Sequence, residues 1–148
     1  RSARVAHCPE SNMKLASGIA PVPRILEAGI AVGLGTDGCA SNNDHDLFSE
    51  MDMAAKLHKL AVMDPCVMDA RTCLKMATIE GARAIGMDRH IGSIEKGKQA
   101  DIIIVDTNNP HMVPMYDPFS SLVYSANSSD VSLVMVAGIV RVRGGQLV

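Results

Sequence analysis

The stretch "IAVGLGTDGCASNND", residues 30–44, passes from an apolar segment into a polar loop and places a carboxylate, Asp37, at the change. The apolar part shows no polar alternation, which is typical of a parallel strand buried on both faces. An Asp-Gly pair is also common in tight turns. These residues alone therefore allow two interpretations of Asp37. It is either a turn residue or an acid at the carboxyl end of a parallel strand, where catalytic and ligand-binding residues of α/β proteins usually lie.

The residues before this stretch complete a strand–helix–strand pattern. "RVAHC", residues 4–8, predicts a short strand that ends near His7. "PESNMKLASGIAP", residues 9–21, predicts a loop, and "PVPRILEAG", residues 21–29, predicts a helix that stops at Gly29. When a helix joins two strands of one sheet, the strands are parallel and the connection is a right-handed crossover. We therefore expect the two strands to be adjacent, with their carboxyl ends on the same side.

The residues that follow predict three helices, over residues 45–63, 68–78 and 79–87. The first of them has apolar residues spaced for one helix face: Leu47, Met51, Ala54, Ala55 and Leu57. The expected helix ends are marked by Asn43 or Asp44 as the cap of the first helix, Asp69 and Thr78 as caps of the next two, and Gly86 as the final stop. The composition becomes β-rich at about residue 91. It predicts a strand within "IGSIEKGKQADIIIVD", residues 91–106, and a hairpin that turns near Gly138.

Composition excludes several classes of partner. The 148 residues carry a formal net charge of −2, without a long basic run, and aromatic residues make up 3% of the chain, so we expect no nucleic-acid partner. No apolar run approaches the roughly 20 residues that span a bilayer, so we expect no membrane partner. Four scattered cysteines without a CxxC pair suggest free thiols and a cytoplasmic protein. The chain lacks an initiator Met, and we expect it to be part of a longer protein.

Five stretches occur in an order that resembles the metal-dependent amidohydrolase superfamily: "HCPESNMKLASG", "GLGTDGCASNN", "ATIEGARAIGM", "IGSIEKGKQADIIIVD" and "DPFSSLVYSANSSDVSLVMVAGIVRVRGG". More narrowly, they resemble the branch of 5-methylthioadenosine/S-adenosylhomocysteine deaminases, guanine deaminases and triazine chlorohydrolases. The resemblance implies an α/β fold consisting of the last two βα units of a (β/α)8 barrel, residues 1–90, followed by the C-terminal part of a β-sandwich, residues 91–148. It implies a parent enzyme that deaminates an adenine-type nucleoside with water activated by a divalent metal, with zinc as the expected ion. Guanine or a chlorinated triazine is the alternative substrate.

The resemblance also assigns roles to individual residues. Asp37 matches the Asp that binds the metal and accepts a proton from the attacking water. His7 matches a pocket residue near the substrate, with a hydrogen-bonded structural histidine as the alternative. Ser11 and Asn12 match the Ser and Asn of the branch's loop after the seventh strand. We prefer a role in supporting this loop through local hydrogen bonds, with direct contact to the substrate as the alternative. For Ser41, Asn42 and Asn43 we prefer a role in capping the next helix.

The remaining motifs carry no further site. His45, His58, His90 and His111 form no HxH or HExxH pattern, and we interpret them as surface or helix residues. The family's HxH pair, the His ligand of its fifth strand and the catalytic Glu and His of its middle strands are absent from the sequence, so Asp37 alone is not expected to retain zinc. An inactive fragment is thus the non-enzymatic hypothesis. Its open strands and helix faces would favour a homo-oligomer.

Overall fold

A computed structural model describes residues 3–148 of the chain, which form a mixed α/β structure with two separate sheets. The first sheet consists of β1 (Arg4–His7) and β2 (Ala31–Leu34). The two strands are parallel, in a register that runs from Arg4 opposite Ala31 to His7 opposite Leu34. The ladder continues past β2, because the Gly35 N–H donates to the His7 carbonyl at 2.9 Å. The predicted parallel pairing is confirmed, and it brings the segments that follow both strands to one end.

Two short helices connect these strands: α1 (Pro9–Lys14) and α2 (Val22–Glu27). The prediction of a loop over residues 9–21 was wrong for its first half, because Pro9 occupies the first turn of α1, a position where its missing N–H costs no hydrogen bond. Helix α2 agrees with its prediction. It ends before Gly29, which adopts a left-handed φ of 73°.

Three helices follow β2: α3 (Leu47–Val62), α4 (Ala70–Ala77) and α5 (Ile79–Ile85). The predicted cap of α4 is confirmed, since the Asp69 side chain accepts from the Thr72 N–H. Helix α5 stops at Gly86 as predicted, with a φ of 78°. Thr78 takes the predicted position before α5, but its hydroxyl donates to the Leu74 carbonyl at 2.7 Å, so it makes no side-chain cap.

The C-terminal third forms an antiparallel sheet of order β3–β4–β5–β6. Its strands are β3 (Ile102–Val105), β4 (Val131–Val136), β5 (Ile139–Arg143) and β6 (Gln146–Leu147). The predicted hairpin joins β4 to β5 through Ala137 and Gly138, both at positive φ. Between β3 and β4 lie two short 3-10 turns, η1 (Pro110–Met112) and η2 (Ser128–Asp130), and helix α6 (Pro118–Tyr124).

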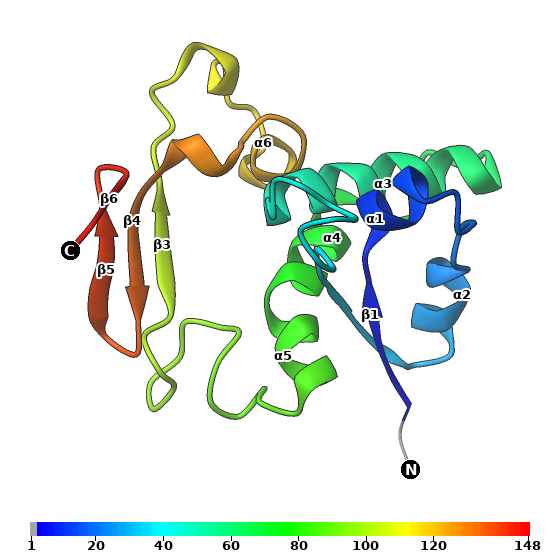
Figure 1. The fold of residues 1–148 in the computed structure, drawn as a ribbon, viewed down its shortest axis with the longest axis horizontal. Helices are drawn as coiled ribbons and strands as arrows, with labels where there is room; N and C mark the ends of the chain where they lie inside the picture. The colour runs from blue at the N-terminus through cyan, green and yellow to red at the C-terminus, as the bar shows by residue number, and fades with distance from the viewer. Residues whose placement is uncertain (1–2) are drawn as a thin grey trace.

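One hydrophobic core joins residues from both sides of residue 91. The buried face of α3 supplies Phe48, Met51, Ala54 and Ala55, and Val123 of α6 is buried in the same cluster. Figure 1 shows α6 beside α3 and α4, with the four-stranded sheet on one side of the molecule and the β1–β2 pair on the other. A hydrogen bond of 3.0 Å from the Ser128 N–H to Asp46 Oδ2 also links the two parts. The packing of α6 thus fixes residues 118–124 against the helices that follow β2.

Within residues 3–148, β1 and β2 pair only with each other, so each leaves one edge open. Large apolar side chains in this part of the chain are also exposed, among them Ile85, Ile94 and Ile103. None of the helices in this part of the chain has the length and apolar character needed to cross a membrane.

Candidate functional site

Asp37 lies three residues beyond the end of β2, on the loop that leads toward α3. The strand itself ends at Leu34, so Asp37 belongs to the loop and not to the strand. The Asp37 backbone takes a left-handed φ of 62°. Asp and Asn tolerate this conformation better than other residues with a side chain. The carboxylate is exposed and stands at the carboxyl end of a parallel pair, where a site was expected.

Two serine hydroxyls hold the Asp37 carboxylate. Ser41 Oγ donates to Asp37 Oδ2 at 2.7 Å, and Ser11 Oγ donates to the same oxygen at 2.9 Å. Hydrogen bonds to the charged form favour that form. The Ser41 hydroxyl first, then the Ser11 hydroxyl and the Gly38 backbone N–H, therefore hold the pKa of Asp37 below its usual value. The arrangement presents an oriented anion to solvent.

The two serines come from different segments. Ser11 is buried in α1, which follows β1, whereas Ser41 is in the loop after β2. Ser41 was expected to help cap the next helix, so its bond to Asp37 is a correction. Asn12 lies next to Ser11 in α1 and is half-buried. Among the hydrogen bonds of residues 3–148, Asn12 contributes backbone contacts to Cys8 and Ser17, and none to Asp37.

The predicted caps of α3 were wrong. Asp46 caps this helix by accepting from the Phe48 N–H at 2.8 Å, because the loop continues two residues beyond Asp44. Asn43 is exposed, and the Asp44 carboxylate accepts from the Asp46 N–H at 3.0 Å. Asn42 is buried, and its amide donates to Glu50 Oε1 at 2.8 Å. Sequence reasoning passed over Glu50, a fully buried carboxylate in the first turns of α3.

His7 is buried at the end of β1 and pairs with His58 of α3. Their Nε2 atoms lie 3.0 Å apart, so one ring donates and the other accepts. Burial, and then the neighbouring His58, lower the pKa of His7 to about 4. Burial also lowers the pKa of His58. His58 is a helix residue, as one of its two interpretations predicted, but it is buried in α3 and does not lie on the surface. Contact between His7 and a substrate stays a prediction.

Among residues 3–148, none of the histidines forms a hydrogen bond with the Asp37 carboxylate. His45 and His90 are exposed. His111 is also exposed, and its Nε2 lies 2.9 Å from Oδ2 of the buried Asp130, which the Asn109 amide and the Asn127 N–H also contact. These bonds join η1 to η2 and fix the approach to β4.

The described residues do not form a complete metal site. No group of three or more His, Cys, Asp or Glu side chains within residues 3–148 is placed to hold a metal ion. A zinc site takes three or four protein ligands. An exposed, oriented carboxylate fits the role of one such ligand, so Asp37 would be one member of a set that other residues must complete.

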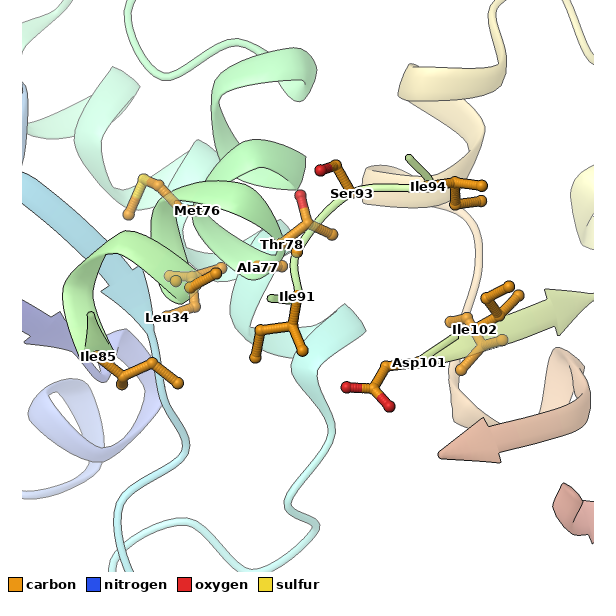
Figure 2. Close-up of a pocket in the computed structure, with 14 residues that line it drawn as sticks. Leu34, Met76, Ala77, Thr78, Ile85, Ile91, Ser93, Ile94, Asp101 and Ile102 are labelled. Carbon is orange, nitrogen blue, oxygen red and sulfur yellow. The ribbon is translucent and has the colours of Figure 1, made fainter. Parts of the chain in front are cut away.

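An open groove of about 500 Å³ lies between the β2–α5 region and the start of β3. Its lining is mainly apolar and includes Leu34, Met76, Ile85 and Ile91 on one side, and Ile94 and Ile102 on the other. Figure 2 shows Asp101 and the Thr78 and Ser93 hydroxyls at its margin. Asp37 does not line this groove, so the groove is separate from the candidate site.

Residues 1–141 match the model of the amidohydrolase family, and the chain belongs to that family. It is 60% identical over 138 residues to the 5-methylthioadenosine/S-adenosylhomocysteine deaminase of Syntrophobacter fumaroxidans. The aligned residues cover 93% of this chain and 32% of the relative. The chain therefore spans about a third of the length of the curated relatives that it matches.

Two solved structures are similar over nearly the whole chain. One is an adenosine deaminase from Xanthomonas campestris with bound zinc, with a TM-score of 0.94 and 45% identity, covering 97% of this chain and 33% of that one. The other is an atrazine chlorohydrolase from Arthrobacter aurescens TC1 complexed with zinc, with a TM-score of 0.91 and 33% identity, covering 99% of this chain and 33% of that one. The predicted family resemblance is confirmed.

Proposed function

We propose that the complete protein deaminates an adenine-type nucleoside, with 5-methylthioadenosine and S-adenosylhomocysteine as the leading substrates. The names of the relatives at 55–60% identity support this choice. The single observation that carries it is the Asp37 carboxylate, oriented by two hydroxyls at the carboxyl end of a parallel strand pair. A chlorinated triazine is the second candidate substrate, because the chlorohydrolase structure is 33% identical. The E. coli guanine deaminase is 23% identical, so it supports the fold alone.

The proposal includes an architecture. Residues 1–90 would form the last two βα units of a (β/α)8 barrel, and residues 91–148 would add the β3–β6 sheet to a sandwich. The open edges of β1 and β2 support this division, because strands within a closed barrel have neighbours on both sides. Exposed apolar side chains such as Ile85, Ile94 and Ile103 would be buried in the complete protein. We also propose that the protein forms a homo-oligomer, which would bury further apolar surface. The four free cysteines suit the proposed cytoplasmic location.

A divalent metal, with zinc the first candidate, would supply the acidity that makes water a nucleophile near neutral pH. Asp37 would be one of its ligands and would accept the proton of the attacking water. The Ser11 and Ser41 hydroxyls keep Asp37 in its anionic form, which both roles require. His7 and Asn12 are proposed as pocket residues on the same end of the strands. Ser11 is proposed to act mainly through Asp37.

The test is substrate profiling with the complete protein that contains this chain. We expect ammonia release from 5-methylthioadenosine, S-adenosylhomocysteine or adenosine to exceed release from guanine, and atrazine to remain unchanged. Faster turnover of guanine or chloride release from atrazine would move the assignment to the other candidates. No turnover of any of these substrates by zinc-loaded protein would contradict the proposed function.

A further inference from the structure

We propose that Glu50 is a positioning residue for Asp37, because its buried carboxylate ties together the two segments that carry Ser11 and Ser41. The kinetic part of this inference rests on the proposed function. Glu50 is fully buried in α3 and makes no contact with Asp37 among the hydrogen bonds of residues 3–148. Its effect would be transmitted through the serines.

The two serines require a fixed distance between their segments. Ser11 belongs to α1 after β1, and Ser41 belongs to the loop after β2, yet both donate to one oxygen of Asp37. Both distances are below 3 Å, and hydrogen bonds weaken steeply when distance or angle departs from these values. A small shift of either segment would therefore release one hydroxyl and turn the carboxylate.

Glu50 contacts the neighbour of each serine. Its Oε2 accepts from the backbone N–H of Glu10, the residue before Ser11, at 3.2 Å. Its Oε1 accepts from the side-chain amide of Asn42, the residue after Ser41, at 2.8 Å. One carboxylate thus holds both segments, one with each oxygen.

The Asn42 side of this bridge has a single orientation. Asn42 is buried, and its Oδ1 accepts from the His45 N–H at 2.7 Å while its amide nitrogen donates to Glu50. Turning the amide over would break both bonds. A carboxylate suits the position opposite, because it offers an acceptor to each of two donors.

The buried position of Glu50 also has a cost. Burial raises the pKa of Glu50 to about 7, against the opposing effect of the bond from the Glu10 N–H. A charged side chain is costly inside a protein unless it is bonded well. The presence of a carboxylate at a position where an apolar residue would pack agrees with a role that depends on both acceptor oxygens. Lys14 bridges the same two segments from the outside, where it donates to the Ala40 carbonyl at 3.1 Å and contacts Asn43.

The test replaces Glu50→Gln in the complete protein. Glutamine keeps the volume but points its NH2 group at either Asn42 or the Glu10 N–H, so one segment loses its bond. We expect kcat to fall about threefold to tenfold, the loss expected from removing one serine hydroxyl from Asp37, with KM changed by less than about threefold. Glu27→Gln, the same substitution at an exposed position at the end of α2, is the matched control and should leave kcat unchanged.

A second arm separates positioning from general destabilisation. If Glu50 acts through the serines, adding Glu50→Gln to the Ser11→Ala, Ser41→Ala double variant should reduce kcat by less than about twofold, because coupled residues are not additive. The inference would be overturned if Glu50→Gln lowered kcat as much in the double serine variant as it does in the parent. It would also be overturned if the kcat of Glu50→Gln alone were within twofold of the parent value. If Glu50→Gln does not fold, as judged by circular dichroism at the assay temperature, Asn42→Ala replaces it in this experiment. Asn42→Ala should lower kcat in the parent but by less than about twofold in the double serine variant.

A third arm does not depend on activity. Crystal structures of the complete parent and the Glu50→Gln variant should show at least one serine hydroxyl beyond 3.5 Å from Asp37 Oδ2 in the variant only. Both bonds intact in the variant would overturn the positioning role. An inactive parent that nevertheless shows this displacement would contradict the proposed function and leave the positioning role supported.

Discussion

Ser41 Oγ lies 2.7 Å from Asp37 Oδ2, so a hydroxyl four residues later in the same loop turns the Asp37 carboxylate and keeps it charged. Together with the bond from Ser11, this contact gives Asp37 an oriented, charged carboxylate. Under the proposed function, such a carboxylate would bind the metal and accept a proton without reorienting during the reaction.

Removing the Ser41 hydroxyl should impair turnover. We expect Ser41→Ala in the complete protein to lower kcat about threefold to tenfold, in line with the loss of one hydrogen bond to a partly solvated charge. The measurement is steady-state ammonia release at saturating nucleoside. Ser17→Ala, at an exposed position shortly after α1, is the matched control. Equal kcat values for the two variants would show that the Ser41 hydroxyl does not contribute to turnover.

The chain of 148 residues expressed alone should not hold zinc. Its described part contributes Asp37 and no group of three ligands, whereas a zinc site needs three or four. We expect well under one zinc per chain by elemental analysis after dialysis, and no ammonia release from S-adenosylhomocysteine. One retained zinc per chain would mean that a ligand set exists without the rest of the protein.

The His7–His58 pair should make stability depend on pH. The pKa of His7 is about 4, below its ordinary 6.5, so the stabilisation is complete above pH 6.5 and is lost as the pH falls toward 4. We expect the free energy of unfolding of the parent, relative to His7→Gln, to drop by about 1–3 kcal/mol between pH 7.5 and 4.5. Urea unfolding at the two pH values measures this difference.

Glu50 changes stability in the opposite direction over much of the same range. Its raised pKa makes the stability that it contributes greatest below its ordinary value of 4.5, and this contribution is lost as the pH rises through 7. Because both proteins in the His7 comparison contain Glu50, its effect cancels in the difference. A parent-minus-variant difference that does not change with pH would show that His7 does not titrate as the buried pair requires.

Close packing of α5 on β2 depends on Gly33. A Cβ at this position would lie 2.9 Å from the Gly81 Cα and 3.4 Å from the Ala84 Cβ, and the first of these is backbone that cannot give way easily. We expect Gly33→Ala to cost about 1–3 kcal/mol, the usual range for overpacking. Gly38→Ala is the control, since its Cβ would meet nothing within 4 Å. Similar melting temperatures for the two variants would contradict this account of the contact.

Much of the scaffold was predictable because its signals are local. The parallel pairing of β1 and β2 follows from a strand–helix–strand pattern with one favoured crossover. The Asp69 cap and the Gly86 stop are set by residue type at helix ends. Helix α1 was missed because Pro9, Ser11 and Asn12 are common in loops, and its six residues are too few for a periodic pattern.

The interior of the site was harder to predict, because its bonds join residues far apart in the sequence. His58 bonds to a residue 51 positions away, and Glu50 to one 40 positions away. A usable signal was present for both, because Glu50 lies four positions before Ala54, and His58 lies three positions after Ala55, on the predicted buried face of α3. Polar residues on such a face require partners, and that requirement indicates an internal hydrogen-bond network.

The most direct test of the central claim is turnover of the Asp37→Asn variant in the complete protein, with the melting temperature measured on the same sample. Asparagine tolerates the left-handed φ of 62° and can accept both serine hydroxyls, so the fold should be little affected. The asparagine side chain carries no negative charge and cannot accept a proton as a general base. Proton transfer by a positioned side chain is worth about 10²–10⁴-fold, so we expect kcat to fall at least about a hundredfold while the melting temperature stays nearly constant. A kcat within about threefold of the parent would contradict the claim and return Asp37 to the role of a turn residue.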